Sequence, residues 1–130
     1  HSFLNWMVQS LVYKKPLTLF RDEVRTPVFV DDLARAALLL LTNPAPGIYH
    51  AGGPDGLSRL EMGEILCRTF SLPSQSIVAA NREDVPAAAH RARDVSLSCH
   101  RLHQLGWRPV SFSDGLNTCL ERWNASSATP

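Results

Sequence analysis

Arginine is the side chain of this sequence best suited to bind an anion. The 130 residues contain eleven Arg and only two Lys, and a planar guanidinium offers paired donors that match the oxygens of a phosphate or a carboxylate. The formal net charge is only +1, so the chain has no long-range field for nucleic acid or a membrane surface, and we expect neither as a partner. A GC-rich genome would give the same arginine bias, so the count alone locates no site.

A glycine-rich turn is the first candidate for a cofactor seat. Gly52-Gly53-Pro54-Asp55-Gly56 follows an expected strand and precedes an expected helix, which is the context of a dinucleotide-binding turn. Its spacing is not G-x-G-x-x-G, and a Pro and an Asp stand where a phosphate needs amide donors and neutrality. A plain tight turn is the better interpretation. Neither Tyr of the chain has a Lys four residues later, so we expect no cofactor-binding and no catalytic residue here.

Histidine and acidic side chains suggest two other kinds of site. His100 and His103 stand three residues apart beside Cys99, but a structural zinc site needs four ligands in recognisable pairs, and no second pair exists. We therefore expect no metal site. The consecutive Asp31 and Asp32 resemble a carboxylate pair for acid–base chemistry. Neighbouring residues at a helix start point apart, so capping by Asp31 explains them better.

Capping residues and hydrophobic periodicity predict the elements that position these side chains. Ser2 can cap a first helix, Ser58 and Glu61 form a capping box, and Gly106 is suited to end a short helix in the left-handed conformation. The expected helices cover residues 2–14, 31–41, 58–72, 99–105 and 113–123, the expected strands or extended segments cover 17–20, 26–30, 48–51, 77–80 and 95–97, and residues 81–93 are expected to form a loop.

These elements indicate an α+β fold in one domain. Hydrophobic residues make up 45% and charged residues 19%, the ordinary balance of a globular protein, and Trp107 and Trp123 are expected to anchor the core. Three cysteines without paired spacing favour a reducing compartment and a cytoplasmic location. No apolar run approaches the roughly 20 residues that span a bilayer. The sequence begins at His1 without Met or a signal-peptide pattern, so we expect a chain cut from a longer protein.

Three stretches in order resemble the extended short-chain dehydrogenases/reductases. Arg25–Ala34 is similar to that family's arginine-led segment, in which a strand and then Asp-Leu-Ala open a helix. Gly47–Gly53 resembles the strand and glycine turn before the family's capped helix. Arg91–Val95, followed by Leu105–Pro109 and a final helix, resembles the family's C-terminal signature. Within the family, the likeness is greatest to dTDP-4-dehydrorhamnose reductases and to the related methionine adenosyltransferase β subunit.

The resemblance implies both a fold and a function. Residues 1–123 would be the substrate-binding C-terminal region of an extended short-chain dehydrogenase/reductase, followed by a flexible tail over residues 124–130, with the Rossmann half missing from the chain. The parent protein would be an NAD(P)-dependent oxidoreductase that reduces a nucleotide-sugar. Its NADP or NAD and its catalytic Tyr would belong to the missing half, so this fragment alone is expected to hold no cofactor and to lack activity.

The resemblance also implies which residues meet the substrate. Arg25 and Arg91 match arginines that in sugar-nucleotide epimerases reach the substrate diphosphate or ribose. Ala92 replaces the family's usual Pro, so Arg93 is a candidate to substitute for Arg91 or to share its role. His50, before the glycine turn, is a candidate for lining the ligand cleft. The alternative for each Arg is a structural ion pair with a nearby carboxylate.

Two other functions remain open. The parent could be a non-catalytic, NADP-binding regulatory subunit that contacts another enzyme, as the methionine adenosyltransferase β subunit does. The chain could also be an inactive truncated product. It would then expose the surface that normally packs on the Rossmann half, and association into homo-oligomers would follow.

Overall fold

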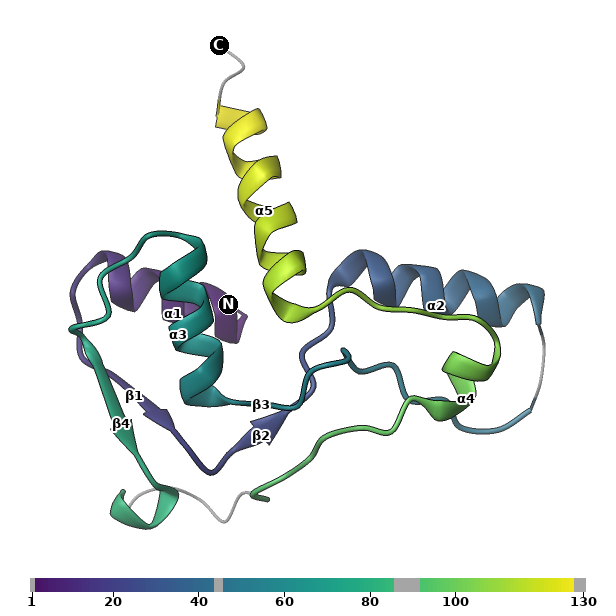
Figure 1. The fold of residues 1–130 in the computed structure, drawn as a ribbon, viewed down its shortest axis with the longest axis horizontal. Helices are drawn as coiled ribbons and strands as arrows, with labels where there is room; N and C mark the ends of the chain where they lie inside the picture. The colour runs from purple at the N-terminus through teal and green to yellow at the C-terminus, as the bar shows by residue number, and fades with distance from the viewer. Residues whose placement is uncertain (1, 44–45, 86–91, 128–130) are drawn as a thin grey trace.

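The structure is a computed structural model that describes residues 2–43, 46–85 and 92–127 (Figure 1). Over these residues, five α-helices, one short 3-10 helix and four short strands confirm the predicted α+β fold. In chain order the elements are α1 (Phe3–Val12), β1 (Leu17–Phe20), β2 (Val24–Arg25), α2 (Val30–Thr42), β3 (Leu57–Ser58), α3 (Arg59–Thr69), β4 (Ile77–Ala80), η1 (Arg82–Asp84), α4 (His100–Gln104) and α5 (Phe112–Ser127).

The described chain forms two lobes (Figure 1). The first lobe contains α1, α3 and the parallel pair of β1 and β4, in which Leu17 pairs with Ile77 and Phe20 with Ala80. Apolar side chains from α1, β1, α3 and the start of α5 form its core, because each of these elements turns one apolar face inward. The buried members are Met7, Leu11, Leu17, Leu19, Met62, Leu66, Cys67 and Leu116.

The second lobe contains α2 and α4 (Figure 1). Its smaller core consists of Ala36, Cys99, Leu102 and Trp107, which are all buried. The indole Nε1 of Trp107 donates to the backbone oxygen of Asp32 at 2.9 Å, so the burial of this polar tip is matched by a hydrogen bond. The predicted core role of Trp107 is confirmed.

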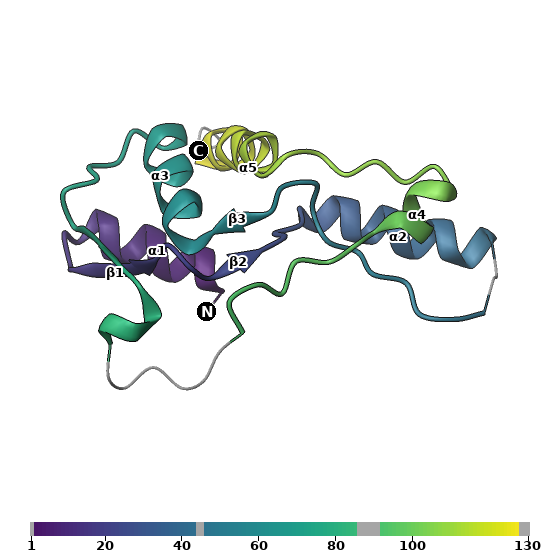
Figure 2. The ribbon, with the colours of Figure 1, turned by 60° about the horizontal axis from the view of Figure 1, so that its bottom comes forward.

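The strands β2 and β3 lie between the two lobes (Figure 2). They pair antiparallel, with Val24 opposite Ser58 and Arg25 opposite Leu57, and Val24 also forms a parallel bridge with Asp94. The described strands therefore make two separate two-stranded sheets. This junction holds Arg25 between segments far apart in the sequence.

Several local predictions are confirmed because they depend on neighbouring residues only. The Ser2 hydroxyl accepts from the Asn5 backbone at the start of α1. Ser58 and Glu61 form the reciprocal capping box of α3, at 3.2 Å and 2.7 Å. Gly106 follows α4 with φ of 92°, the left-handed conformation that glycine adopts without steric cost.

Other predictions were wrong. The N-cap of α2 is Phe29, two residues before the predicted cap, so Asp31 lies in the first turn instead of capping the helix. Residues 48–51 form no strand, and the stretch 26–30 contains none either, since the nearest strand, β2, ends at Arg25 just before it. Trp123 is 71% exposed, because α5 extends away from both lobes (Figure 1). That helix also starts at Phe112 and continues to Ser127, beyond the expected end at Trp123.

Candidate functional site

Arg25 is held at the junction of the two lobes by the strand that contains it. Its side chain is 20% exposed, and one terminal nitrogen, Nη2, lies 3.6 Å from Oε2 of Glu23. The other terminal nitrogen donates to the backbone oxygen of Val24 at 2.7 Å. Glu23 itself is buried, with 1% of its surface exposed. The structural ion pair weighed from the sequence therefore exists, and its partner is Glu23.

A second arginine reaches the same carboxylate from α3. Arg59 is the first residue of that helix, directly after the Ser58 cap, and its Nε also lies 3.6 Å from Oε2 of Glu23. Its guanidinium lies over the Phe3 ring, 3.9 Å from the centroid, a cation–π geometry. Arg59 was not predicted as a site residue. The only sequence signal was its place inside the Ser58–Glu61 capping box, which does not indicate what the side chain faces.

A hollow of about 470 Å³ opens beside these two arginines. Among the residues that the structure describes, Arg25 and Arg59 are the charged ones that line it, and most of the others are apolar. A guanidinium beside apolar walls interacts more strongly with an anion than one in open water, because the local dielectric is lower. The lining residues are Ser2, Phe3, Leu4, Met7, Arg25, Thr26, Pro27, Val28, Arg59, Met62, Val95, Leu97 and Phe112.

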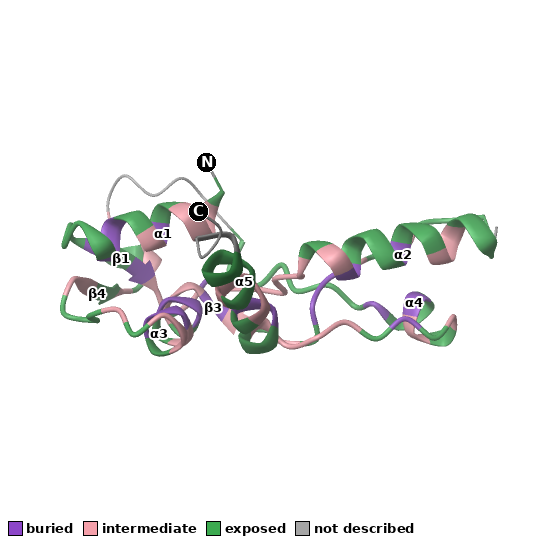
Figure 3. Ribbon diagram, turned by 90° about the horizontal axis from the view of Figure 1, so that it is seen from above, coloured by how far each residue is buried: buried purple, intermediate pink, exposed green. Residues whose placement is uncertain are grey.

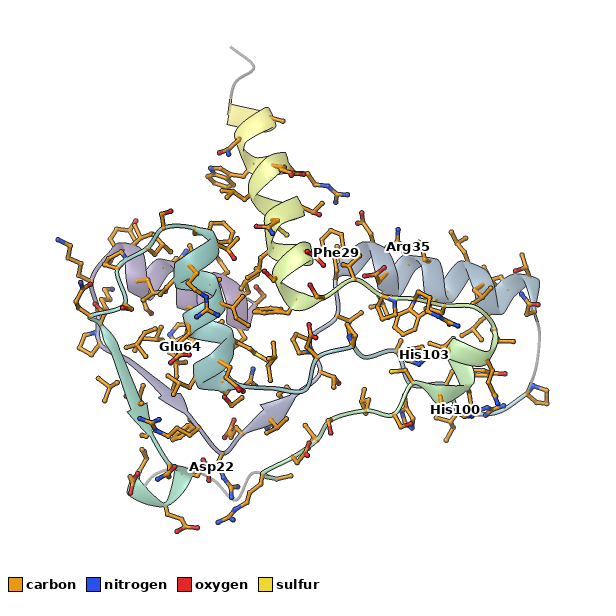
Figure 4. The ribbon with its side chains drawn as sticks, in the orientation of Figure 1. Asp22, Phe29, Arg35, Glu64, His100 and His103 are labelled. Atoms are coloured by element: carbon orange, nitrogen blue, oxygen red, sulfur yellow. The ribbon has the colours of Figure 1, made fainter. Side chains whose placement is uncertain are left out.

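A second hollow, of about 410 Å³, adjoins the first and shares Ser2, Leu4, Val28 and Phe112 with it. The base of α5 and the residues just before α2, including Phe29 (Figure 4), form its wall. No charged side chain of the described ranges lines it. Together the two hollows give a site with a cationic end and an apolar end, which suits a ligand that joins an anionic group to a less polar one.

The glycine turn packs against the segment that contains Arg25. Gly53 donates from its backbone to Thr26 at 3.2 Å, and a Cβ added to Gly53 would lie only 1.9 Å from the backbone oxygen of Pro27. Glycine is therefore required here for close approach of two backbone segments. This face of the turn is occupied by the chain itself.

Comparison with known protein families decides the relationship. The family described as RmlD substrate binding domain matches residues 1–125. The chain belongs to this family. The resemblance to extended short-chain dehydrogenases/reductases, found in the sequence, is thereby confirmed.

The chain is similar to several named proteins, each longer than the chain itself. Methionine adenosyltransferase 2 subunit beta of Danio rerio is 28% identical over 94 residues, which cover 68% of this chain and 29% of that protein. The dTDP-4-dehydrorhamnose reductase of Bacillus anthracis, solved in complex with NADP, superposes with a TM-score of 0.80 at 19% identity, covering 91% of this chain and 42% of that one. A dTDP-glucose 4,6-dehydratase of Streptomyces venezuelae, solved with NAD, gives a TM-score of 0.73 at 28% identity, covering 95% and 38%. The chain therefore spans less than half the length of each.

The other site residues predicted from the sequence lie elsewhere or outside the described residues. Arg91 falls in the stretch 86–91, which the structure does not describe. Arg93 is exposed, and its guanidinium donates to Glu83 at 2.6 Å. His50 is exposed, and neither it nor Arg93 lines the hollow beside Arg25. Of the four predicted residues, the described structure places only Arg25 at the hollow.

The acidic pair at the start of α2 has structural partners. Asp32 is fully buried; it forms an ion pair with Arg35 and accepts from the Val110 backbone at 3.0 Å. Asp31 accepts two hydrogen bonds from Arg122 on α5, at 2.5 and 3.2 Å. The hydrogen bond and charge of Arg122 lower the pKa of Asp31 below its ordinary value. These contacts join α2 to the last segments of the chain and leave no acid–base pair.

The histidine pair that was considered as a metal site lies in the lobe of α2. His100 and His103 are both on α4, far from Asp22 (Figure 4). The described residues contain no group of three or more His, Cys, Asp or Glu placed to hold a metal ion.

Asp94, near Arg25, has a pKa lowered first by hydrogen bonding from Ser96 and also by the Arg25 charge. No helix among the described residues has the length and hydropathy needed to cross a bilayer.

Proposed function

We propose that this chain is the substrate-binding part of an NAD(P)-dependent reductase of nucleotide-activated sugars, and that Arg25 binds the substrate diphosphate. The observation that carries the proposal is the partly buried Arg25 guanidinium, 20% exposed, at a hollow whose charged lining residues, within the described part of the chain, are both arginines. A diphosphate is multiply anionic and accepts paired, charge-assisted bonds from a guanidinium. The relationship to reductases and dehydratases of dTDP-sugars supports this substrate class.

The chemistry assigned to these residues is binding and orientation. Arg25 would hold the diphosphate at the cationic end, and the apolar walls would exclude water from the charge-assisted bonds, which strengthens them. Hydride transfer is not assigned to the chain, because the glycine turn is packed on residues 26–27. The roles of Arg91, Arg93 and His50 in substrate binding stay predictions.

The rest of the proposed enzyme would cover α2. The outward side of this helix is apolar over its whole length, with Val30, Leu33, Leu38 and Leu41 between 47% and 77% exposed, and α2 is mostly exposed in Figure 3. A contiguous apolar surface of this kind marks an interface. We propose the Rossmann half as its partner, since the chain spans only 42% of the B. anthracis reductase.

The direct test is calorimetric titration of the full chain with dTDP-glucose and UDP-glucose, with glucose as the control ligand. Arg25→Gln removes the charge and the guanidinium but keeps a polar side chain, and we expect an affinity loss of about 10- to 100-fold. Arg21→Gln is the matched control, because Arg21 is exposed and lies outside the lining of the hollow. If Arg25→Gln binds the nucleotide-sugars as tightly as the unmodified chain does, the proposed role of Arg25 is wrong. If neither nucleotide-sugar binds, the substrate class is wrong.

A regulatory subunit is the second candidate, favoured by the 28% identity to methionine adenosyltransferase 2 subunit beta. In that case the chain would contact a catalytic subunit, and any hydride transfer would be secondary. Co-purification with a methionine adenosyltransferase catalytic subunit distinguishes the two functions. A stable complex whose enzyme activity changes supports regulation, whereas no complex together with nucleotide-sugar binding supports the reductase.

A further inference from the structure

We infer that Arg59 is a second anion-binding residue, and that buried Glu23 positions Arg59 and Arg25 as a pair on one phosphoryl-bearing ligand. The inference rests on the proposed function, because it assumes that an anion binds beside Arg25. It adds a residue that the sequence did not point to and that comes from a different element. No catalytic role is assigned to either arginine.

The geometry brings the two guanidiniums to one place. Nη2 of Arg25 and Nε of Arg59 each lie 3.6 Å from the same atom, Oε2 of Glu23. The two nitrogens are therefore no farther from each other than twice that distance. Both side chains line the same hollow. A single phosphate or diphosphate group is large enough to accept hydrogen bonds from both.

Positive charge gathers on the side of the site that faces the hollow. Among the described residues, Arg25 and Arg59 line the hollow, whereas Glu23 and Asp94 do not. The first turn of α3 adds the positive end of the helix dipole, since Arg59 is the first residue of this eleven-residue helix. A cation at a helix N-terminus is unfavourable for the helix itself, so helix stability does not explain an arginine at this position. Binding of an anion at the hollow would offset that repulsion.

The position of Arg59 is fixed before any ligand binds. The capping box fixes the start of α3, the Arg59 backbone N–H donates to the Glu23 backbone oxygen at 3.1 Å, and its guanidinium lies over the Phe3 ring. The side chain is 23% exposed, so it is held while one side still faces the hollow. Such preorganisation reduces the ordering cost on binding.

The experiment titrates the full chain with inorganic pyrophosphate and with dTDP-glucose, for Arg25→Gln, Arg59→Gln and the double variant. Arg21→Gln is the charge-matched control. We expect each single substitution at the hollow to weaken pyrophosphate binding about 10- to 100-fold. The fold-loss of pyrophosphate affinity in the double variant should be smaller than the product of the two single fold-losses, because both arginines bind one group. Circular dichroism checks that each variant is folded.

Two further measurements separate binding from a structural role. Arg59→Lys keeps the charge but not the planar fork, so it should bind pyrophosphate with an affinity between those of Arg59→Gln and the unmodified chain. Added salt should weaken pyrophosphate binding less steeply in Arg59→Gln than in the unmodified chain, because one charge contact is gone.

The outcomes distinguish this inference from the proposed function. If Arg59→Gln or Arg59→Lys is folded and binds both ligands like the unmodified chain while Arg25→Gln binds weakly, the inference fails and the proposed function stands. If Arg59→Gln does not fold, a stable Arg59→Lys with weakened binding still supports the inference. If both single glutamine variants bind dTDP-glucose normally, the two proposals fail together.

Discussion

Nε of Arg59 lies 3.6 Å from the buried carboxylate of Glu23, and this contact joins the start of α3 to the segment that leads into β2. The same carboxylate oxygen contacts Arg25. Glu23 is therefore the centre of a charged group at the junction of two lobes that have separate hydrophobic cores. Both the stability of the junction and the direction of the two arginines depend on it.

Removal of the Glu23 carboxylate should destabilise the protein strongly. Glu23→Ala leaves two partly buried guanidiniums beside each other without their common counter-charge, and loss of one partner from a buried ion pair typically costs about 3–5 kcal/mol. Because each arginine is about one-fifth exposed, we expect the free energy of unfolding, measured with urea, to fall by about 2–3 kcal/mol. Glu121→Ala, at an exposed position of α5, is the control. A Glu23→Ala variant as stable as this control would show that the charged group does not hold the junction.

The glycine turn should tolerate a methyl group at one glycine and not at another. At Gly53 a Cβ would lie 1.9 Å from the Pro27 backbone oxygen, whereas at Gly56 its nearest neighbour is a Val24 methyl at 3.7 Å. Gly53→Ala must push two backbone segments apart, so we expect a loss of about 2–4 kcal/mol. Gly56→Ala should stay within about 1 kcal/mol of the unmodified chain. Equal melting temperatures for the two variants would contradict the close packing of the turn.

The ion pair between Asp31 and Arg122 should make stability depend on pH in the acidic range. The Arg122 hydrogen bond lowers the pKa of Asp31 in the folded state, so this pair contributes stability above the unfolded-state pKa and loses it as the pH falls through the folded-state value. We expect the stability difference between the unmodified chain and Arg122→Gln to be present at pH 7. It should disappear as the pH falls below about 4. A difference that persists at pH 2 would exclude this ionic origin.

The two tryptophans should respond differently to truncation. Trp107 is 4% exposed and donates to Asp32, whereas Trp123 is 71% exposed. Trp107→Ala should cost about 3–5 kcal/mol, and Trp123→Ala should cost less than about 0.5 kcal/mol. Chemical unfolding of the two variants, followed by circular dichroism, compares them directly. A large cost at Trp123 would mean that α5 packs on something in solution.

The apolar side of α2 should cause association when this chain is studied alone. Leu38 and Leu41 are 63% and 77% exposed, so we expect light scattering to show concentration-dependent oligomers. The double variant Leu38→Glu/Leu41→Glu places charge on this side and should reduce the association. A monomer at all concentrations would show that this surface needs no partner.

Local features of the fold were predictable from the sequence, and contacts between distant segments were not. The Ser58–Glu61 box depends on residues three apart, and it is present as predicted. Trp123 lies on the same apolar side of α5 as Leu116. This pattern does not show how much of the helix length packs against the rest of the protein. Residues 48–51 were expected to form a strand, yet a strand needs a second strand to pair with, and the described residues supply none there.

The candidate site was predicted in part for the same reason. The resemblance to a family identified Arg25, and the structure places it at a hollow. Arg59 was not predicted, because its place in the site depends on a contact with Glu23 that it shares with Arg25 across the junction. Arg93 has the residue type for anion binding, but its guanidinium is bonded to Glu83. Residue type suggests chemistry, and only the three-dimensional arrangement tells which arginines meet.

The most direct test is a crystal structure of the full chain with dTDP-glucose bound. We predict that the diphosphate lies in the hollow beside Arg25, with its oxygens within hydrogen-bond distance of that guanidinium. A diphosphate bound elsewhere on the chain, with Arg25 still facing an empty hollow, would contradict the proposed role of this chain.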